Sequence, residues 1–294
     1  MRSMTWEECE AFAADVHTAL YKTTPSPLGE RIARGVNAYS VAFLIQENGV
    51  LKPAGSGTTV SYRDEDYFLT AAHVWHEKLK DAELVAIPLS EGSRKHFSIK
   101  PSVLVAIGPE RPAEWDRWGP DIVLLRIPPE LVGKFRANGR SFHNLSNPLR
   151  VPSICVVECW FQFGAPAEKG VYTRERGVPE MNAILLGPFT GYFGPPSTET
   201  AAKDEFDFID LLLDTSLPDA ASRPHGISGG GLWRLCLYKN SDGEIEWKRI
   251  LEGVAFFWIP RDEPNRIQVR CHGPQSIGRT LKYLEDFNSS LWRG

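Results

Sequence analysis

Short apolar runs separated by turn-forming residues constrain the fold of this chain more than any other feature of its sequence. In the first half the runs lie at 38–46, 56–62, 67–72, 84–89, 97–107 and 121–127. In the second half they lie at 153–163, 183–189, 206–213, 231–238, 245–257 and 266–271. Runs of this length between Gly, Pro, Asn and Asp residues are typical of β-strands. Two such groups predict an all-β protein built as two barrels or sandwiches.

A helical pattern stands at each end of the strand-rich region. Residues 5–20 open with Thr5 and Glu8 in a capping-box arrangement, and their apolar residues recur at helical spacing. Residues 276–288 show the same spacing after a serine that can cap a helix. Between the two groups of strands, residues 128–150 are rich in Pro, Gly and Asn and lack a strand pattern. We interpret them as a connection between halves.

The composition excludes several classes of protein. The 294 residues are 42% hydrophobic, which is incompatible with a disordered chain and sufficient for a buried core. The 33 Lys and Arg residues nearly balance the 37 Asp and Glu residues. A balanced chain has no bulk attraction to nucleic acid or to an anionic membrane surface. No apolar run reaches the roughly 18 residues of a membrane span. We therefore expect neither nucleic acid nor membrane as a partner.

The cysteines and the N-terminus indicate a location. The five cysteines are an odd number, and no two have the spacing of a zinc or redox motif. The first 20 residues carry acids where a signal peptide needs an apolar core. We therefore expect a cytoplasmic protein whose cysteines are small core residues.

Two segments each carry a titratable residue where an apolar strand begins or ends. Residues 68–74 (FLTAAHV) run from a strand through two small residues to His73. Residues 119–127 (GPDIVLLRI) set Asp121 between a turn pair and a strand. A partly buried, charged aspartate needs a hydrogen-bonding partner, and a histidine Nδ1–H is a suitable donor. Taken singly, His73 also fits a structural histidine and Asp121 a turn-forming residue.

A third segment surrounds one serine with glycines. Residues 226–233 read GISGGGLW, with Ser228 near the centre. Glycine lets the backbone fold tightly and leaves its N–H groups accessible. The N–H groups of Gly226 and Ser228 can therefore form a cavity for developing negative charge. The alternative is a flexible glycine-rich loop, but the strand pattern that follows at once favours a defined turn.

Together the three segments resemble motifs of the chymotrypsin/trypsin-like serine peptidases. TAAH stands at 70–73, DIVLL at 121–125 and GISGG at 226–230, in the family's chain order of His, Asp and Ser. The resemblance implies two six-stranded antiparallel β-barrels, with an N-terminal helical extension and a C-terminal helix. The implied division is an extension at 1–35, a barrel with His and Asp at 36–135, a barrel with Ser at 150–275 and a closing helix at 276–294.

The same resemblance implies a serine endopeptidase acting on a protein or peptide substrate through an acyl-enzyme. Ser228 is then the nucleophile, His73 its general base and Asp121 the residue that orients His73. The N–H groups of Gly226 and Ser228 form the oxyanion hole. No cofactor and no metal ion is expected.

Five positions bear on activation and specificity. Ile227 stands where digestive members of the family carry the aspartate that receives a new N-terminus, so we expect no activation by N-terminal trimming. Phe256, Phe257 and Trp258 stand where the family usually has small residues at two positions. These side chains either narrow the substrate pocket or pack in the core. Ser222 is nearest in register to the base of that pocket.

Two other functions compete with an active peptidase. One is a regulatory or binding module that keeps the peptidase fold behind a blocked pocket, with the helix at 5–20 available to dock a regulatory protein. The other is a metal enzyme using His73 and His76, which are spaced as H-x-x-H. That pair lacks the glutamate pattern of helical zinc proteases, and the further ligands are not evident.

Overall fold

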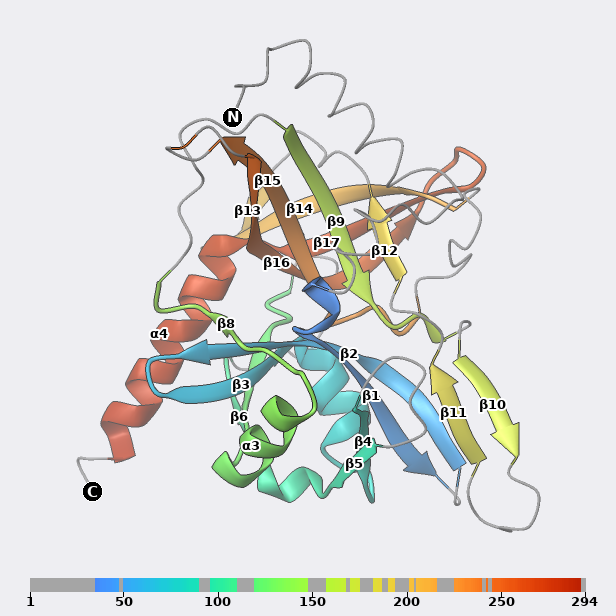
Figure 1. The fold of residues 1–294 in the computed structure, drawn as a ribbon, viewed down its shortest axis with the longest axis vertical. Coiled ribbons are helices and arrows are strands. Elements are labelled where there is room, and N and C mark those ends of the chain that lie inside the picture. The colour runs from blue at the N-terminus through green and yellow to red at the C-terminus, as the bar shows by residue number, and fades with distance from the viewer. Residues whose placement is uncertain are drawn as a thin grey trace.

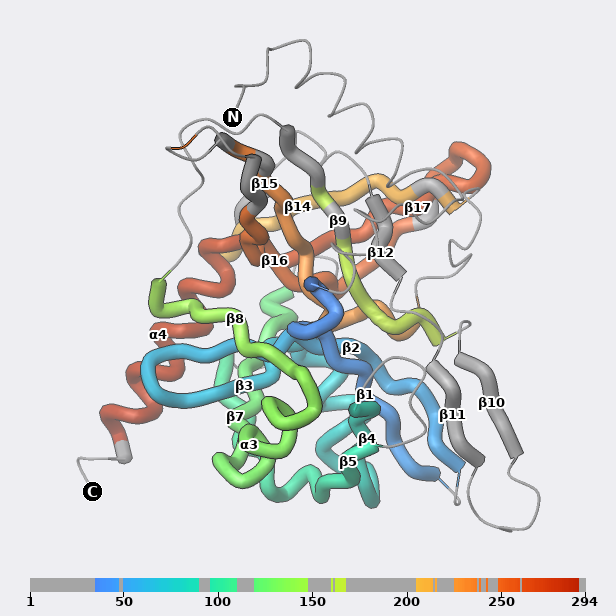
Figure 2. Tube along the Cα trace, in the orientation of Figure 1, coloured from blue at the N-terminus to red at the C-terminus, as the bar shows by residue number. Residues whose placement is uncertain are grey.

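The structure, a computed structural model, is mostly β and is built from two sheets with few helices (Figure 1). It describes residues 35–47, 50–89, 96–109, 119–147, 157–167, 170–174, 182–186, 190–193, 201–203, 205–215, 225–239, 242 and 245–291. Figure 2 follows the same chain as a tube. The helix expected at 5–20 lies outside the described residues.

The first sheet is formed mainly by the N-terminal half. Its main path runs β5-β4-β1-β2-β3-β7-β6, and these pairs are antiparallel. These strands are β1 (Ser40–Glu47), β2 (Val50–Tyr62), β3 (Glu65–Thr70), β4 (Val85–Pro88), β5 (His96–Ile99), β6 (Val105–Ile107) and β7 (Val123–Arg126). Apolar and β-branched residues fill the buried faces of these strands, which explains why the sequence runs predicted them.

The second sheet is formed by the C-terminal half. Its seven described strands run β12-β9-β15-β16-β17-β14-β13, with antiparallel pairing throughout. They are β9 (Val157–Gly164), β12 (Thr190–Phe193), β13 (Ala201–Lys203), β14 (Phe206–Asp214), β15 (Gly231–Lys239), β16 (Ile245–Pro260) and β17 (Arg266–His272). The predicted all-β fold with two mainly antiparallel sheets is confirmed, and it is consistent with a chymotrypsin-like double barrel.

The described sheets contain more strands than the six expected in each barrel. Three further strands extend the first sheet to ten described strands: β8 (His143–Asn144), β10 (Gly170–Arg174) and β11 (Asn182–Leu186). β8 and β11 pair in parallel with β2, and β10 pairs with β11. A strand as short as β8 has no detectable alternation. The β10–β11 hairpin comes from the second half of the chain, and sequence periodicity carries no information about which sheet a hairpin joins.

The segment 128–150 contains a helix as well as a connection. α3 (Pro129–Ala137) starts with proline in its first turn and buries Val132 and Phe135. The fixed φ of proline suits this residue to the first turn of a helix. With only two buried apolar positions over nine residues, the helical period was too weak to stand out in the sequence.

The predicted C-terminal helix is confirmed, and it begins two residues before the expected start at 276. α4 (Pro274–Leu291) contacts β14, β16 and β17 of the second sheet and β6 of the first. Figure 1 shows it running along one side of the molecule past both sheets. Ile277 and Leu284 belong to a buried cluster that includes residues of both sheets. α4 therefore ties the two halves together through apolar burial.

Candidate active site

A histidine and an aspartate meet where two paired strands bring their ends together. The antiparallel pairing of β3 and β7 sets Thr70 opposite Val123. Just beyond these residues, Nδ1 of His73 lies 2.6 Å from Oδ2 of Asp121. The main-chain N–H of His73 also donates to Oδ1 of Asp121, with an N···O distance of 2.7 Å. One carboxylate therefore fixes both the backbone and the ring of His73.

The surroundings of this pair keep the aspartate buried and leave the histidine accessible. The side chain of Asp121 is 6% exposed, whereas that of His73 is 23% exposed. Burial of a carboxylate is costly unless it is hydrogen-bonded, and the two N–H donors of His73 meet that need. Because Nδ1 donates to the carboxylate, Nε2 carries the lone pair in the neutral ring. His73 can thus accept a proton at Nε2.

The segment around Ser228 forms a tight turn at the start of β15. The N–H of Gly230 donates to the carbonyl oxygen of Ile227 (2.8 Å), and the N–H of Gly229 donates to that of Ala255 (2.7 Å). Gly226 and Gly229 have φ of +92° and +86°. Residues with a side chain rarely adopt these values, so both positions favour glycine. The glycine-rich segment is therefore the defined turn that the sequence predicted.

Glycine at position 229 also brings this turn against the strand that leads to His73. A Cβ atom there would lie 2.1 Å from the main-chain oxygen of Ser56 and 2.1 Å from Oγ1 of Thr70. It would also lie 3.1 Å from the main-chain nitrogen of Ala71. Only a residue without Cβ permits this approach. The turn that carries Ser228 thus packs on the end of β3, immediately before His73.

Ser56 in β2 binds the serine turn to the first sheet. Its hydroxyl donates to the carbonyl oxygen of Gly226 at 2.6 Å and accepts from the N–H of Ala165 at 2.9 Å. Its main-chain N–H donates to the carbonyl oxygen of Ser228 at 2.8 Å. Its own carbonyl accepts from Oγ1 of Thr70 at 2.7 Å. One buried residue therefore fixes the serine turn relative to the strand that ends near His73.

The N–H groups of Gly226 and Ser228, predicted to bind an oxyanion, belong to peptide units whose carbonyl oxygens already accept hydrogen bonds. The carbonyl oxygen of His225 accepts from the N–H of Ala167, and that of Ile227 accepts from Gly230. In a trans peptide the N–H points opposite to the carbonyl. The N–H of Gly226 is therefore directed away from Ala167, and that of Ser228 away from Gly230.

The structure brings His73, Asp121 and the Ser228 turn to one region but does not join all three by hydrogen bonds. His73 and Asp121 are directly bonded. Among the described residues, Ser228 Oγ forms no hydrogen bond to His73. Hydrogen bonds of this kind often tighten only when substrate binds.

The positions singled out for substrate binding have different surroundings. Phe256 is buried, with its ring stacked on His272 at a centroid distance of 4.2 Å. Phe257 is 38% exposed, and Trp258 meets the ring of His225 edge to face at 5.6 Å. Phe256 thus lies in the core and Phe257 at the surface, whereas Trp258 is half-buried and packs against a buried cluster of the second sheet. Ser222 lies outside the described residues.

Ser56 and His272 contact this region and were not identified from the sequence. Ser56 stands in the small-residue run GSG at 55–57, a weak sign of close backbone approach. His272 accepts a hydrogen bond from the main-chain N–H of Asp121 at 2.9 Å, although the two residues are 151 positions apart. No sequence signal connects residues at such a separation.

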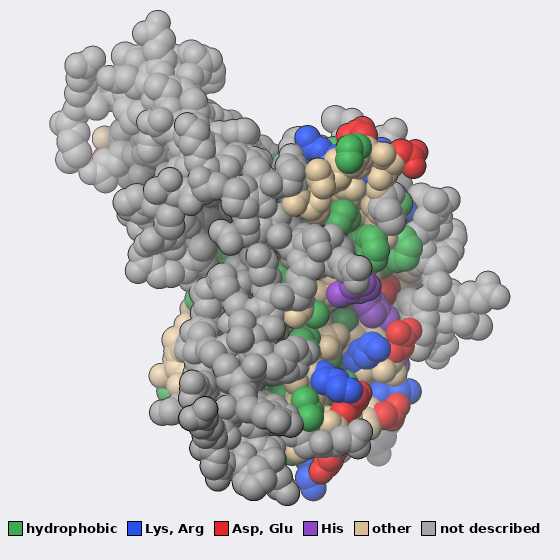
Figure 3. Space-filling model, turned by 90° about the vertical axis from the view of Figure 1, so that its right-hand side faces the viewer, with side chains coloured by type: hydrophobic (Ala, Val, Ile, Leu, Met, Phe, Trp, Pro, Cys, Tyr) green, Lys and Arg blue, Asp and Glu red, His purple; other side chains and the backbone are tan. Residues whose placement is uncertain are grey.

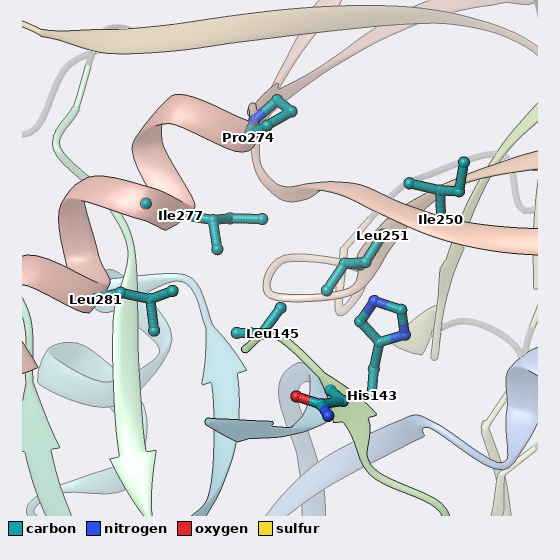
Figure 4. Close-up of a pocket in the computed structure, with 9 residues that line it drawn as sticks. His143, Leu145, Ile250, Leu251, Pro274, Ile277 and Leu281 are labelled. Carbon is teal, nitrogen blue, oxygen red and sulfur yellow. The ribbon is translucent and has the colours of Figure 1, made fainter. Parts of the chain in front are cut away.

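A hollow lies between the two sheets and α4. Its volume is about 200 Å³, and it is lined by parts of β16 and α4 and by residues 143–145. Figure 4 shows Leu145 and Ile277 pointing toward the same space. Burial, with a smaller effect of Arg249, lowers the pKa of His143 to about 4. His73, Asp121 and Ser228 are not among the residues that line this hollow.

The described surface and core carry few other candidate sites. On the face drawn in Figure 3, acidic and basic side chains are interspersed and histidine side chains reach the surface. Cys236 and Cys271 are buried thiols. In the described part of the chain, no three His, Cys, Asp or Glu side chains cluster as metal ligands would. No described helix has the length and apolar character needed to cross a membrane.

Two solved structures that are similar to this chain are distant matches. No family model and no curated protein matches the chain. One similar solved structure comes from work on how aromatic interactions drive coupled folding and binding of the intrinsically disordered Sesbania mosaic virus VPg protein. It has a TM-score of 0.41 and 17% identity, over 80% of this chain and 85% of that chain. Another is the Drosophila Grass clip serine protease of the Toll pathway, with a TM-score of 0.43 and 16% identity, over 84% of this chain and 68% of that chain. These values are too low to assign the chain to a family.

Proposed function

We propose that this chain is a serine endopeptidase that hydrolyses peptide bonds with Ser228, His73 and Asp121. The observation that carries the proposal is the double hydrogen bond from His73 to the buried Asp121 carboxylate, next to the turn that bears Ser228. This is the pairing that a general-base histidine needs, because it fixes the ring and stabilises the imidazolium that forms during reaction.

The first chemical step is attack by Ser228 on the carbonyl carbon of the substrate. As the C–O bond forms, the hydroxyl proton passes to Nε2 of His73. The imidazolium then gives this proton to the leaving amine as the peptide C–N bond breaks. Asp121 remains ionised and compensates the positive charge on His73 through its bond to Nδ1–H. The product of this half-reaction is an acyl-enzyme on Ser228.

The second half-reaction uses the same groups with water in place of the serine. His73 takes a proton from water as the water oxygen attacks the acyl carbon. The imidazolium then gives this proton to Oγ of Ser228 as the ester C–O bond breaks, which releases the acid product and restores the serine. In both halves a negative charge develops on the carbonyl oxygen. The N–H groups of Gly226 and Ser228 are the donors assigned to that charge. Removal of one such donor in other enzymes costs roughly 10²–10³ in rate.

The experiment that tests this function is covalent labelling with a fluorophosphonate probe. The native chain should be labelled at one site, identified as Ser228 by mass spectrometry, and should cleave members of a peptide library. Ser228→Ala should abolish both reactions while keeping the fold, since only the hydroxyl is removed. Ser61→Ala is the matched control, because Ser61 lies in β2 and is only partly buried.

Two results would overturn the proposal. One is absence of labelling on folded native protein, and the other is equal labelling of native protein and Ser228→Ala. Either result, combined with no cleavage of the library, would favour the second candidate, a binding module on a peptidase fold. The contact between Trp258 and His225, next to Gly226, is the observation that favours such a restrained site.

A further inference from the structure

A buried histidine of the second sheet supports the backbone of Asp121. His272 is the last residue of β17 and has no exposed surface. The main-chain N–H of Asp121 donates to Nε2 of His272 at 2.9 Å. Asp121 also binds His73 through its side-chain carboxylate. Asp121 is therefore fixed at its backbone by one histidine and at its carboxylate by another.

The protonation of His272 follows from its partners. A main-chain N–H can only donate, so Nε2 of His272 must accept and carries no proton. The neutral ring then carries its proton on Nδ1, which faces Oγ of Ser276 at 3.2 Å. Burial lowers the pKa of His272 to about 3, so the ring stays neutral near pH 7. Its face stacks on Phe256.

Ser276 connects this histidine to the first turn of α4. Its hydroxyl lies 2.8 Å from Oδ1 of Asp207 and accepts from the N–H of Asp207 at 3.0 Å. The carboxylate of Asp207 in turn accepts the main-chain N–H groups of Gln275 and Ser276, at 3.1 and 2.7 Å. A carboxylate at this place satisfies the unpaired donors at a helix N-terminus and favours its dipole. The start of α4 is therefore fixed at the residue that binds His272.

We propose that His272 is a positioning residue for the reaction, holding the Asp121 backbone so that its carboxylate meets His73. Ser276 and Asp207 keep the ring in the tautomer that accepts from Asp121. The kinetic role of His272 rests on the proposed function, since positioning matters only if Asp121 and His73 act on a substrate. Its effect on the His73–Asp121 hydrogen bond does not depend on activity.

Two substitutions at position 272 separate the hydrogen bond from packing. His272→Phe keeps a flat ring against Phe256 but removes the acceptor for the Asp121 N–H. His272→Gln restores an acceptor oxygen near the place of Nε2. Ile277→Ala is the control for packing, because Ile277 follows Ser276 at the start of α4, is buried and lines the hollow shown in Figure 4.

Two readouts apply to each folded variant. The first is the low-field proton resonance of His73 Nδ1–H, assigned by its loss in Asp121→Asn. The second is the rate of labelling by the fluorophosphonate probe. His272→Phe should shift or broaden the resonance and slow labelling about 10- to 100-fold, the scale expected for a small misplacement of reacting groups. His272→Gln should recover most of both signals, and Ile277→Ala should retain both.

The proposal is overturned if His272→Phe keeps the native resonance, or if Ile277→Ala changes it as much as His272→Phe does. If His272→Phe fails to fold, Ser276→Ala supplies the test, because it removes the partner of Nδ1 and leaves the ring. A native resonance in Ser276→Ala would then count against the proposal. If the native chain is never labelled, the proposed function fails, and the resonance alone decides the role of His272.

Discussion

The hydroxyl of Ser56 donates a hydrogen bond of 2.6 Å to the carbonyl oxygen of Gly226, across 170 positions of the sequence. Ser56 belongs to the first sheet, and Gly226 begins the turn that carries Ser228. Together with the bond from the Ser56 N–H to the Ser228 carbonyl, it fixes the serine turn to the sheet that supplies His73 and Asp121. The candidate site thus depends on a junction between the halves.

Substitution of Ser56 by alanine should loosen this junction. The change leaves the N–H of Ala165 and the carbonyl of Gly226 without their partner, and unmade buried hydrogen bonds cost about 1–3 kcal/mol. We expect a loss of that size in the free energy of unfolding and slower fluorophosphonate labelling. Urea unfolding and labelling kinetics measure the two effects. Ser61→Ala in the same strand should change neither, and equal effects of both substitutions would contradict the prediction.

Substitution of Gly229 by alanine should be far more damaging than an ordinary Gly-to-Ala change. Position 229 has φ of +86°, and the new Cβ would meet Ser56 and Thr70 at 2.1 Å. We expect a loss of about 2–5 kcal/mol from backbone strain and overpacking. Gly133→Ala is the matched control, because no atom lies within 4 Å of a Cβ there. That helical substitution should stabilise α3 slightly, and thermal unfolding of both variants checks the contrast.

Substitution of Asp121 by asparagine should lower turnover sharply with little effect on the fold. The amide can still occupy the site, but it no longer carries the charge that compensates the imidazolium of His73. In the chymotrypsin-like enzymes that serve as the general template, the equivalent change lowers kcat about 10⁴-fold. We expect a loss of similar order in kcat on any peptide the native chain cleaves. Native-like activity in Asp121→Asn would exclude the proposed role of Asp121.

Substitution of Asp210 by alanine should destabilise the second sheet. Its carboxylate oxygens lie 2.8 Å from Nε and 2.8 Å from Nη2 of Arg270, and both residues are buried. Breaking a buried pair by removing one partner costs about 3–5 kcal/mol. The exposed pair of Glu47 and Lys52 is the control, and Glu47→Gln should have little effect because solvent screens it. Similar unfolding curves for both variants would refute this expectation.

The free energy of unfolding should fall as the pH falls from 6.5 to 4. Burial lowers the pKa of His143 to about 4 and that of His272 to about 3, against 6.5 in the unfolded chain. Between these values the unfolded state binds protons that the folded state does not, so acid favours unfolding, by at most about 3 kcal/mol per histidine. Urea unfolding at pH 7 and pH 5 measures the slope. His272→Gln should reduce it, and equal stability at both pH values would contradict the assignment.

The sequence by itself predicted the fold class, because strand runs and helical spacing are local patterns that survive into the folded chain. β14 at 206–214, for example, lies almost where the apolar run predicted a strand. It also identified His73, Asp121 and Ser228 as candidate residues, since each stands in a short motif with a chemical reason for its composition. The pairing of His73 with Asp121 was expected from the need of a buried carboxylate for a donor.

The tertiary structure decided what depends on contacts between distant positions. The hydrogen bonds of Ser56 with Gly226 and of Asp121 with His272 join residues that no local pattern relates. The β10–β11 hairpin joined the first sheet although it follows the connection between halves. Periodicity predicts which face of a strand is buried, but it does not predict which element covers that face. The packing of the two sheets and α4 therefore determines the surroundings of the candidate residues.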